Sequence, residues 1–267
     1  GVDAGKLGEA ISKVLAAGES RTVRVSVVTS PPSITDQDAR AMGIKEKISS
    51  FTTQHPCCAP RVTNIQTIAR ILDGHIVKPG QTFSLNTVVG PRDRARGFVP
   101  APMILNGRFV DDVGGGISQF VTTMFNAVFF AGLQDVQHMA HSYYISRYPA
   151  GRESTVSYPQ PDFRWRNDSP HGVLIKTSYT GTSITVDFWG TKRYDIESQS
   201  SDRYAIKKHE EIKESGDDCV PMPGADGFSI DVYRIFKKDG RVVRKQKFHT
   251  VYLPEPKLTC EPKEGGD

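Results

Sequence analysis

One apolar stretch, residues 117–131, constrains the fold of this chain more than any other feature. Its apolar positions are Ile117, Phe120, Val121, Met124, Phe125, Val128 and Phe129. These positions cover more than one face of a helix, so we expect a helix that begins near Ser118, is buried on several sides and ends at Gly132. A chain of 267 residues, 37% of them hydrophobic, is long enough to enclose such a helix in a core.

Around this helix the sequence predicts an α+β fold in which antiparallel sheets pack against a few helices. Strands are expected where apolar and polar residues alternate, and hairpins where two such runs flank a short turn. The expected hairpins are 173–179 with 183–189 and 228–236 with 241–252, a further strand is expected at 21–29, and residues 198–218 are expected to hold one strand and a loop. The other expected helices are 5–17, 35–42 (with Thr35 as the cap) and 62–72.

Three regions follow from this pattern. Residues 1–45 would contain only two helices and a strand, too little for a domain, so we expect them to be the end of a module that begins upstream. Residues 46–195 hold the unusual motifs and form the expected core domain. Residues 196–267 form an expected β-rich C-terminal extension.

The composition excludes several classes of partner. The net charge is only +4 and the chain shows no concentrated basic stripe, so we expect no nucleic-acid binding. The longest apolar run is too short to cross a membrane, because a spanning helix needs about 20 apolar residues. The scattered histidines show no metal-ligand spacing, so neither a metal nor a cofactor is expected.

The four cysteines indicate an oxidising compartment. Their number is even and they lack the C-x-x-C spacing of a zinc site. We expect a Cys219–Cys260 disulfide. Cys57 and Cys58 are adjacent, so they form a strained bridge with each other, pair elsewhere or stay reduced.

The last hairpin is rich in basic residues that mostly alternate with apolar ones. They are Arg234, Lys237, Lys238, Arg241, Arg244, Lys245 and Lys247. The pattern predicts either a solvated sheet face or a surface for an anionic partner.

The most distinctive motif is the glycine triplet Gly114-Gly115-Gly116 directly before the buried helix. Glycines there permit unusual backbone angles and let a ligand approach the main chain. Ser118 would lie at the helix N-terminus, where unpaired N–H groups and the helix dipole favour negative charge. The alternative is that Ser118 simply caps the helix. A nucleotide site is disfavoured because the triplet lacks the lysine or the spacing of the known phosphate-binding loops.

Six segments in order resemble the VanW family of bacterial cell-surface proteins. They are FTTQHPCCAPRVTNI (51–65), LDGHIVKPGQTFSLNTVVGPR (72–92), GFVPAPMI (97–104), DVGGGISQFVTTMFNAVFFAGL (112–133), HSYYISRYPAGRESTV (141–156) and DFRWRN (162–167). The upstream piece, residues 1–45, is similar to the end of a peptidoglycan-binding domain that often precedes VanW domains. The resemblance implies an extracytoplasmic, cell-envelope location, with any membrane anchor in a segment outside this sequence.

The resemblance also implies a site. Some VanW proteins are L,D-transpeptidases whose cysteine nucleophile lies in the string GGGICQ, which matches residues 114–119 and places Ser118 at the cysteine position. A family histidine matches His141, and Glu153 stands where the family has aspartate.

In an acyl-transfer site of this kind, Ser118 would attack a stem-peptide carbonyl, His141 would accept the proton and Glu153 would orient the imidazole. Backbone N–H groups of residues 116–119, among them that of Gln119, would hold the oxyanion, and Arg152 would bind a stem-peptide carboxylate.

Each of these residues also has a purely structural interpretation. His141 could be a buried histidine bonded to backbone, Arg152 and Glu153 a structural ion pair, and Asn126 a buried polar tie. The hypotheses for the whole chain are an acyl transferase with serine replacing cysteine, a non-catalytic stem-peptide-binding module, and a wall scaffold without a ligand site.

Overall fold

The computed structural model describes residues 2–17, 22–27, 35–105, 108–216 and 219–261. The chain folds as two compact units, residues 1–41 and 42–267. The first unit contains α1 (Ala4–Ala17) and α2 (Asp36–Ala41). Thr35 caps α2 as expected, because its Oγ1 accepts the N–H of Asp38 at 3.1 Å while the Asp38 carboxylate accepts the N–H of Thr35 at 2.9 Å.

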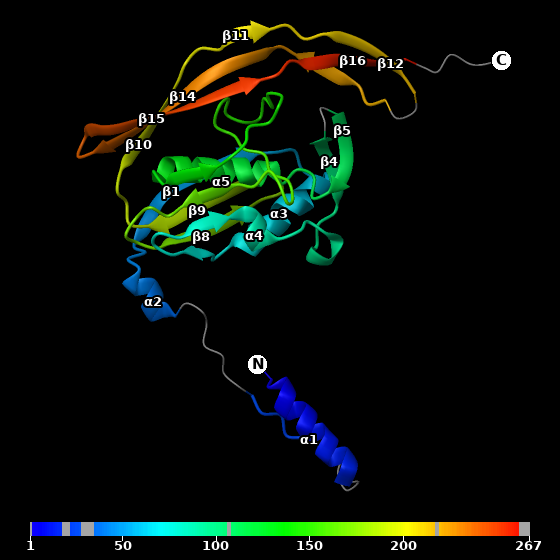
Figure 1. Cartoon of the computed structure of the whole chain (residues 1–267), viewed down its shortest axis with the longest axis vertical. Helices are drawn as coiled ribbons and strands as arrows, with labels where there is room; N and C mark the ends of the chain where they lie inside the picture. The colour runs from blue at the N-terminus through cyan, green and yellow to red at the C-terminus, as the bar shows by residue number, and fades with distance from the viewer. Residues whose placement is uncertain (1, 18–21, 28–34, 106–107, 217–218, 262–267) are drawn as a thin grey trace, which may run out of the picture. The chain divides into compact units, whose positions relative to one another are not determined.

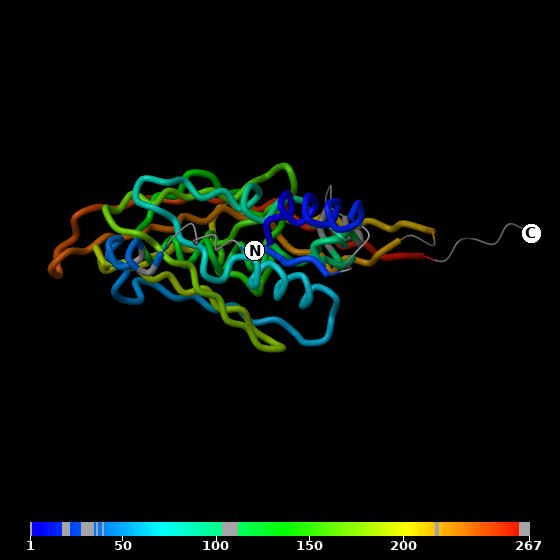
Figure 2. The backbone as a smooth tube through the Cα atoms, turned by 90° about the horizontal axis from the view of Figure 1, so that it is seen from below, coloured from blue at the N-terminus to red at the C-terminus, as the bar shows by residue number. Residues whose placement is uncertain are grey.

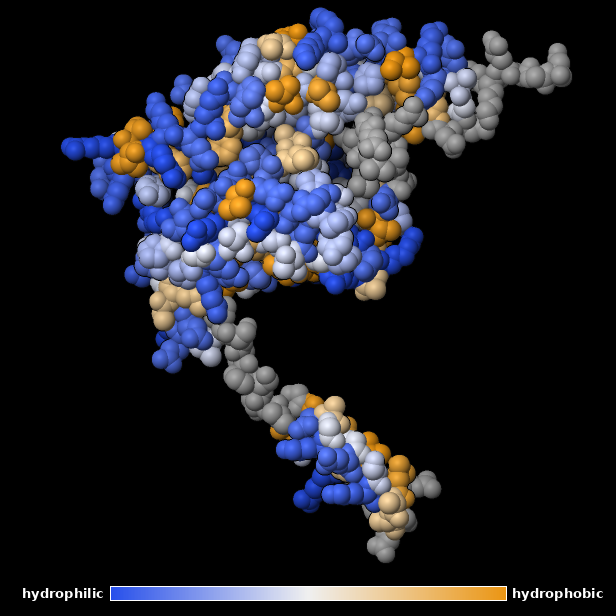
Figure 3. Space-filling model, viewed as in Figure 1, coloured by the Kyte–Doolittle hydropathy of each residue, from blue (hydrophilic) through white to orange (hydrophobic). Residues whose placement is uncertain are grey.

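The prediction of a strand at 21–29 is wrong for residues 22–27, the part of this range that the structure describes. Residues 22–26 form no strand, and Val27 makes only an isolated bridge with Val2. Helix α1 buries none of its residues, and Figure 3 shows apolar atoms exposed along its surface. Without a core to pack against, alternation alone does not hold a strand. The assignment of residues 1–45 to an upstream module stays a prediction.

The second unit is built around α5 (Ser118–Ala131), and the expected α+β fold is confirmed. Below α5 in Figure 1 lies an antiparallel sheet of four strands. In spatial order these are β1 (Glu46–Gln54), β9 (Ser183–Gly190), β8 (Val173–Tyr179) and β2 (Ile76–Val77). Helix α3 (Pro60–Leu72) packs beside α5, and α4 (Leu85–Val89) packs against α3.

A second sheet covers the opposite side of α5 (Figure 1). It consists of β10 (Asp195–Ser200), β14 (Gly227–Lys238), β15 (Arg241–Tyr252) and β11 (Tyr204–Lys207). Val232 of β14 and Phe248 of β15 belong to the same core cluster as the side chains of α5. Both expected hairpins, and the termination of α5 at Gly132 with φ 68°, are confirmed.

Smaller elements complete the second unit. They are η1 (Arg94–Arg96), the three-stranded sheet β3 (Thr82–Ser84), β7 (Arg164–Arg166) and β6 (Gln134–Gln137), the pair β4 (Pro100–Leu105) and β5 (Arg108–Val113), and the sheet β12 (Glu211–Ser215), β16 (Glu255–Glu261) and β13 (Met222–Ala225). Figure 2 shows the orange-to-red strands extending along this unit. Among the described helices, none is long and apolar enough to cross a membrane.

The expectation of one strand and a loop at 198–218 is wrong. The region from 195 to 215 contributes three strands, β10, β11 and β12. Most of their side chains are exposed or half-buried, so apolar alternation is absent from their sequences. They form because β14 and β16 offer unpaired backbone groups to neighbouring chain.

The basic hairpin also differs from its prediction at one residue. Arg234 is only 1% exposed and lies among the rings of Phe129, Phe236 and Phe248. Its Nη1 donates to the carbonyl oxygens of Val128 and Phe129 at the end of α5. Arg234 therefore belongs to neither a solvated face nor an anionic docking surface.

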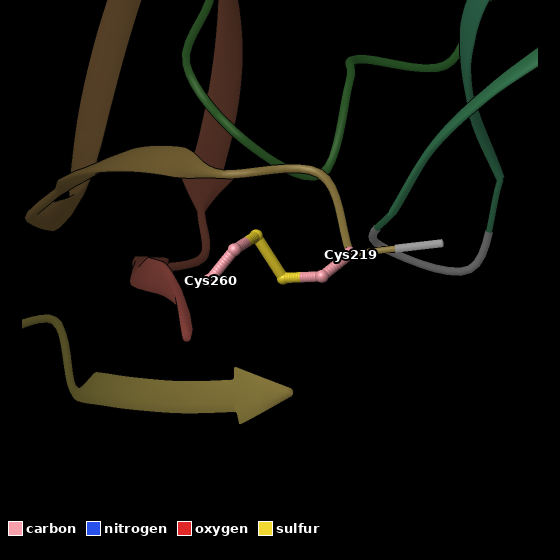
Figure 4. Close-up of a disulfide and its surroundings, with 2 residues drawn as sticks. All are labelled: Cys219 and Cys260. Atoms are coloured by element: carbon pink, nitrogen blue, oxygen red, sulfur yellow. A yellow bond between two sulfur atoms is a disulfide. The ribbon is translucent and has the colours of Figure 1, made fainter. Parts of the chain in front are cut away.

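The expected Cys219–Cys260 disulfide is present, and it joins the chain just before β13 to β16 (Figure 4). Cys57 and Cys58 are both free and exposed, so of the three alternatives the structure shows the reduced one.

We predict that the unreduced protein exposes two titratable thiols per chain, and four after reduction and unfolding. The double variant Cys219→Ser/Cys260→Ser should lower the free energy of unfolding by roughly 4 kcal/mol, because the bridge closes a loop with a sequence separation of 41. Thiol titration and urea unfolding measure both effects. The matched control, Cys57→Ser/Cys58→Ser, removes exposed thiols and should change stability by no more than about 0.5 kcal/mol. Four reactive thiols before reduction would contradict the bridge.

Candidate functional site

A cavity of about 250 Å³ opens at the N-terminal end of α5. Its walls are residues 91 and 92, residues 112–118, and residues 156–158. The glycine triplet and Ser118 therefore line the same cavity, through which a ligand could approach the main chain.

The glycine triplet is required by its surroundings. Gly114 and Gly116 have φ of +92° and +86°, where side chains are strained. A Cβ on Gly115 would lie 2.0 Å from the carbonyl oxygen of Ala101. Side chains at the outer two positions would also collide with Arg92 and Arg61, at 2.8 and 2.6 Å from their Cβ atoms. The loop is therefore packed between two arginines.

Ser118 is the first residue of α5, and it is not the helix cap. The cap position is Ile117, whose side chain makes no capping hydrogen bond. The Oγ of Ser118 lies 3.1 Å from Oγ1 of Thr155. The interpretation of Ser118 as a simple cap is therefore wrong, because its hydroxyl is hydrogen-bonded to Thr155 and Ile117 occupies the cap position.

Two of the backbone N–H groups expected to hold an oxyanion are already used. Ile117 N–H donates to Gly114 O at 3.4 Å, and Gln119 N–H donates to Gly116 O at 3.1 Å. Within the described residues, the N–H groups of Gly116 and Ser118 have no such acceptor. These two are the available donors beside the Ser118 hydroxyl.

His141 and Glu153 form a buried pair. The carboxylate of Glu153 is hydrogen-bonded to Nδ1 of His141 and accepts the backbone N–H of His141 at 2.9 Å. Their side chains are 9% and 1% exposed. An ionised carboxylate only accepts hydrogen bonds, so Nδ1 carries the hydrogen and Nε2 of a neutral ring is free to accept a proton.

One segment connects this pair to Ser118. Residues 152–155 run along α5, where Asn126 Nδ2 donates to Arg152 O at 2.8 Å, and Thr155 reaches Ser118. The opposite edge of the segment pairs with the chain before His141, through Thr155 N–H and Met139 O at 2.7 Å. Ser118 thus contacts Thr155 and His141 contacts Glu153, two residues that are only two positions apart in the sequence. Within the described residues no hydrogen bond joins them, and His141 does not line the cavity.

Gln119 and Arg152 also lie outside the cavity walls. Gln119 is fully buried and binds Thr53, the carbonyl of Gln54, and Nη2 of Arg61. The guanidinium of Arg152 lies 5.1–6.0 Å from the ring centres of Phe51, Phe129 and Phe130, and burial lowers its pKa.

Both side chains therefore help to hold α5 in place, and neither lines this cavity. Asn126 is the buried polar tie that one interpretation anticipated, because it is fully buried and joins α5 to the segment at 152.

Three residues of the site were not anticipated: Arg92, Thr155 and Tyr252. Tyr252 comes from β15, and its hydroxyl donates to Glu153 Oε1 at 3.3 Å and accepts the N–H of Gly151 at 3.0 Å. Burial and the nearby Glu153 carboxylate raise the pKa of Tyr252, so it stays protonated. Arg92 and Thr155 lie in sequence segments quoted above, but no spacing rule singles them out.

Comparisons with known proteins show which proteins this chain is similar to. The family model described as "VanW like protein" matches residues 60–189. The protein YoaR of Bacillus subtilis is 42% identical over 131 residues, which cover 49% of this chain and 43% of YoaR. The Vancomycin B-type resistance protein VanW of Enterococcus faecalis is 27% identical over 116 residues, 41% of this chain and 42% of the relative.

The chain thus spans less than half the length of these relatives. No solved structure is significantly similar to it. The matched residues run from α3 to β9 and include α5 with its glycine triplet, so this part of the chain is a VanW-like domain.

Proposed function

We propose that the chain is a peptidoglycan-directed protein of the cell envelope with an L,D-transpeptidase-like acyl-transfer site at position 118. The observation that carries the proposal is the position of Ser118: it begins a buried helix, lines an open cavity and lies beside two N–H groups that have no acceptor among the residues the structure describes. The Cys219–Cys260 disulfide supports an oxidising, extracytoplasmic location. The printed name of the Enterococcus relative, a vancomycin resistance protein, supports a role at the cell wall.

In this reaction the Ser118 oxygen attacks the carbonyl carbon of a peptide bond between an L- and a D-residue. The C–N bond breaks, the leaving amine takes up a proton and an acyl ester forms. The amine of a second stem peptide then displaces the serine and forms a new amide. The N–H groups of Gly116 and Ser118 would stabilise the oxyanion, and Nε2 of His141, held by Glu153, would carry the proton.

Serine limits this chemistry. A hydroxyl needs a general base in contact with it, and within the described residues the hydroxyl of Ser118 is hydrogen-bonded only to the neutral hydroxyl of Thr155. A cysteine at the same helix N-terminus would be favoured as the thiolate without such a contact. This observation favours a second candidate function, a non-catalytic module that binds stem peptides in the same cavity.

We predict that Ser118→Cys converts the protein into an active transpeptidase. The background should carry Cys57→Ser and Cys58→Ser, because those exposed thiols would otherwise react. In this background the thiol at position 118 should be alkylated at pH 7 and titrate below about 8.5, the value for free cysteine. Mass spectrometry of incubated muropeptides should show new crosslinks, which Ser118→Ala should not form.

The outcomes separate the two candidate functions. Crosslinks with the cysteine variant support the acyl-transfer site. Stem-peptide binding that is equal in the wild type and Ser118→Ala, together with an inert thiol at position 118, supports the binding module. A protein that neither binds nor crosslinks stem peptides would contradict both.

We further predict that Glu153→Gln, made in the active cysteine background, lowers the crosslinking rate by about 10²–10⁴-fold. The glutamine amide would donate to Nδ1 and place the hydrogen of His141 on the wrong nitrogen. Rates from muropeptide assays check this, with circular dichroism to confirm folding. An unchanged rate in a folded variant would show that His141 has no part in proton transfer.

Tyr252→Phe should have a smaller effect of the same kind. It removes one hydrogen bond to Glu153 and the acceptor of the Gly151 N–H. We expect the crosslinking rate to fall roughly tenfold, about the effect of one hydrogen bond to a charged group, with substrate affinity unchanged. Tyr233→Phe on β14, whose hydroxyl has no role in this cluster, is the matched control. Equal rates for the two variants would contradict a positioning role for Tyr252.

A further inference from the structure

The tip of the hairpin between β14 and β15, residues 238–245, extends beyond the rest of its sheet. Strand β10 pairs with β14 only up to Lys237, so the turn that follows lies past the last pair with β10. Figures 1 and 2 both show this hairpin projecting at one end of the second unit. All of the residues from 238 to 245 are exposed, so the tip takes no part in the core.

Two neighbouring valines are exposed in the tip. Val242 is 50% and Val243 is 55% exposed. The register of the two strands shifts between Phe236 and Lys237, which leaves Val243 without a partner residue in β14, as in a β-bulge. In Figure 3, which has the view of Figure 1, apolar atoms lie among hydrophilic ones where the hairpin projects. Such side chains gain free energy from a partner that removes them from water.

Four cations accompany the valines, and within the described residues no item of acidic chemistry pairs with them in a salt bridge. By contrast, the two lysines on either side of the tip are paired, Lys237 with Glu197 and Lys247 with Asp231. The tip contains one acidic residue, Asp239, so its net charge is +3, against +4 for the whole chain. The four cations are Lys238, Arg241, Arg244 and Lys245.

The size of the tip limits what it can bind. A stable protein–protein interface takes about 20–30 residues from each partner, far more than a turn and the strand ends beside it provide. A soluble polyanion would neutralise the cations but would leave the valines in water. The surface of a bilayer with anionic lipids offers phosphates to the cations and, just below them, an apolar phase to the valines.

We propose that the 238–245 tip binds the surface of a membrane that contains anionic phospholipids. Val242 and Val243 enter the boundary between headgroups and acyl chains, and the four cations contact the lipid phosphates. The inference goes beyond the reaction proposed at Ser118 and does not depend on it. It assigns the anionic partner that the sequence pattern of the basic hairpin left open.

The experiment measures sedimentation of the whole chain with lipid vesicles in roughly 0.1 M salt. Vesicles of equal parts phosphatidylglycerol and phosphatidylcholine should bind the protein at least tenfold more tightly than vesicles of phosphatidylcholine alone. Arg241→Gln/Lys245→Gln should weaken binding to the anionic vesicles by about fivefold for each cation removed. The matched control, Lys45→Gln/Lys78→Gln, removes two exposed lysines outside the hairpin and should leave binding unchanged.

A second pair of variants tests the valines. Val242→Ser/Val243→Ser should weaken binding to the anionic vesicles roughly tenfold, because the apolar contact is lost. Its matched control is Ile71→Ser/Val136→Ser, two apolar residues outside the hairpin that are 38% and 44% exposed, and this control should bind like the wild type. Circular dichroism confirms that each variant is folded.

A fluorescent label reports insertion directly. Val243→Cys, made with Cys57→Ser and Cys58→Ser, carries an environment-sensitive dye whose emission should shift to the blue on anionic vesicles. The same dye on Lys45→Cys in that background should show no shift.

Three results would overturn the inference. The first is a wild-type protein that does not bind the anionic vesicles, which needs no variant to establish. The second is equal binding by the tip variants and their controls. The third is vesicle binding that the valine substitutions leave unchanged and that inorganic polyphosphate abolishes, because the tip would then bind a soluble polyanion.

Discussion

The burial of α5 is the constraint on which the rest of the second unit depends. Except for Ser118 and Phe130, all its side chains are buried between two sheets, so its polar side chains need partners inside the protein, and within the described residues only Oδ1 of Asn126 has none. Thr123 pairs with Thr53 of β1, and Thr122 and Asn126 bind the segment at 152–154. These bonds fix the rotation and depth of the helix, and they thereby fix the position of its N-terminus at the cavity.

The C-terminal sheet completes this arrangement although it lies beyond the residues that match the family model. Arg234 of β14 donates to the carbonyl oxygens of Val128 and Phe129 near the end of α5, which also accept the backbone N–H groups of Leu133 and Gly132. Tyr252 of β15 bonds both Glu153 and the backbone of Gly151. Two strands that come late in the sequence therefore support the site. Strand β14 holds the C-terminal end of α5, and β15 holds the carboxylate of Glu153, which orients His141.

Local patterns predicted what depends on local chemistry. The apolar positions of α5, the glycines on either side of it and the turns of the two hairpins each have a physical reason that lies within a few residues. The roles of the arginines have no such local reason. Arg92 lines the cavity, Arg152 packs on aromatic rings and Arg234 binds a helix end, although the three look alike in the sequence. A long side chain takes its role from tertiary contacts that no spacing reveals. The strands between 195 and 215 were predicted incorrectly for a related reason, since their pairing partners come later in the chain.

The charges around the glycine triplet explain why the identity of residue 118 matters so much. Arg92 lies against Gly114 and Arg61 against Gly116, and burial together with nearby Arg147 lowers the pKa of Arg61, a sign that positive charge is concentrated there. With the helix N-terminus, these groups stabilise whichever group at the site becomes negative. A cysteine benefits before the reaction, as a thiolate, whereas a serine benefits only as the oxyanion forms. The same electrostatic surroundings therefore suit a nucleophilic thiolate and a developing oxyanion, and a neutral serine makes use of them only in the second case.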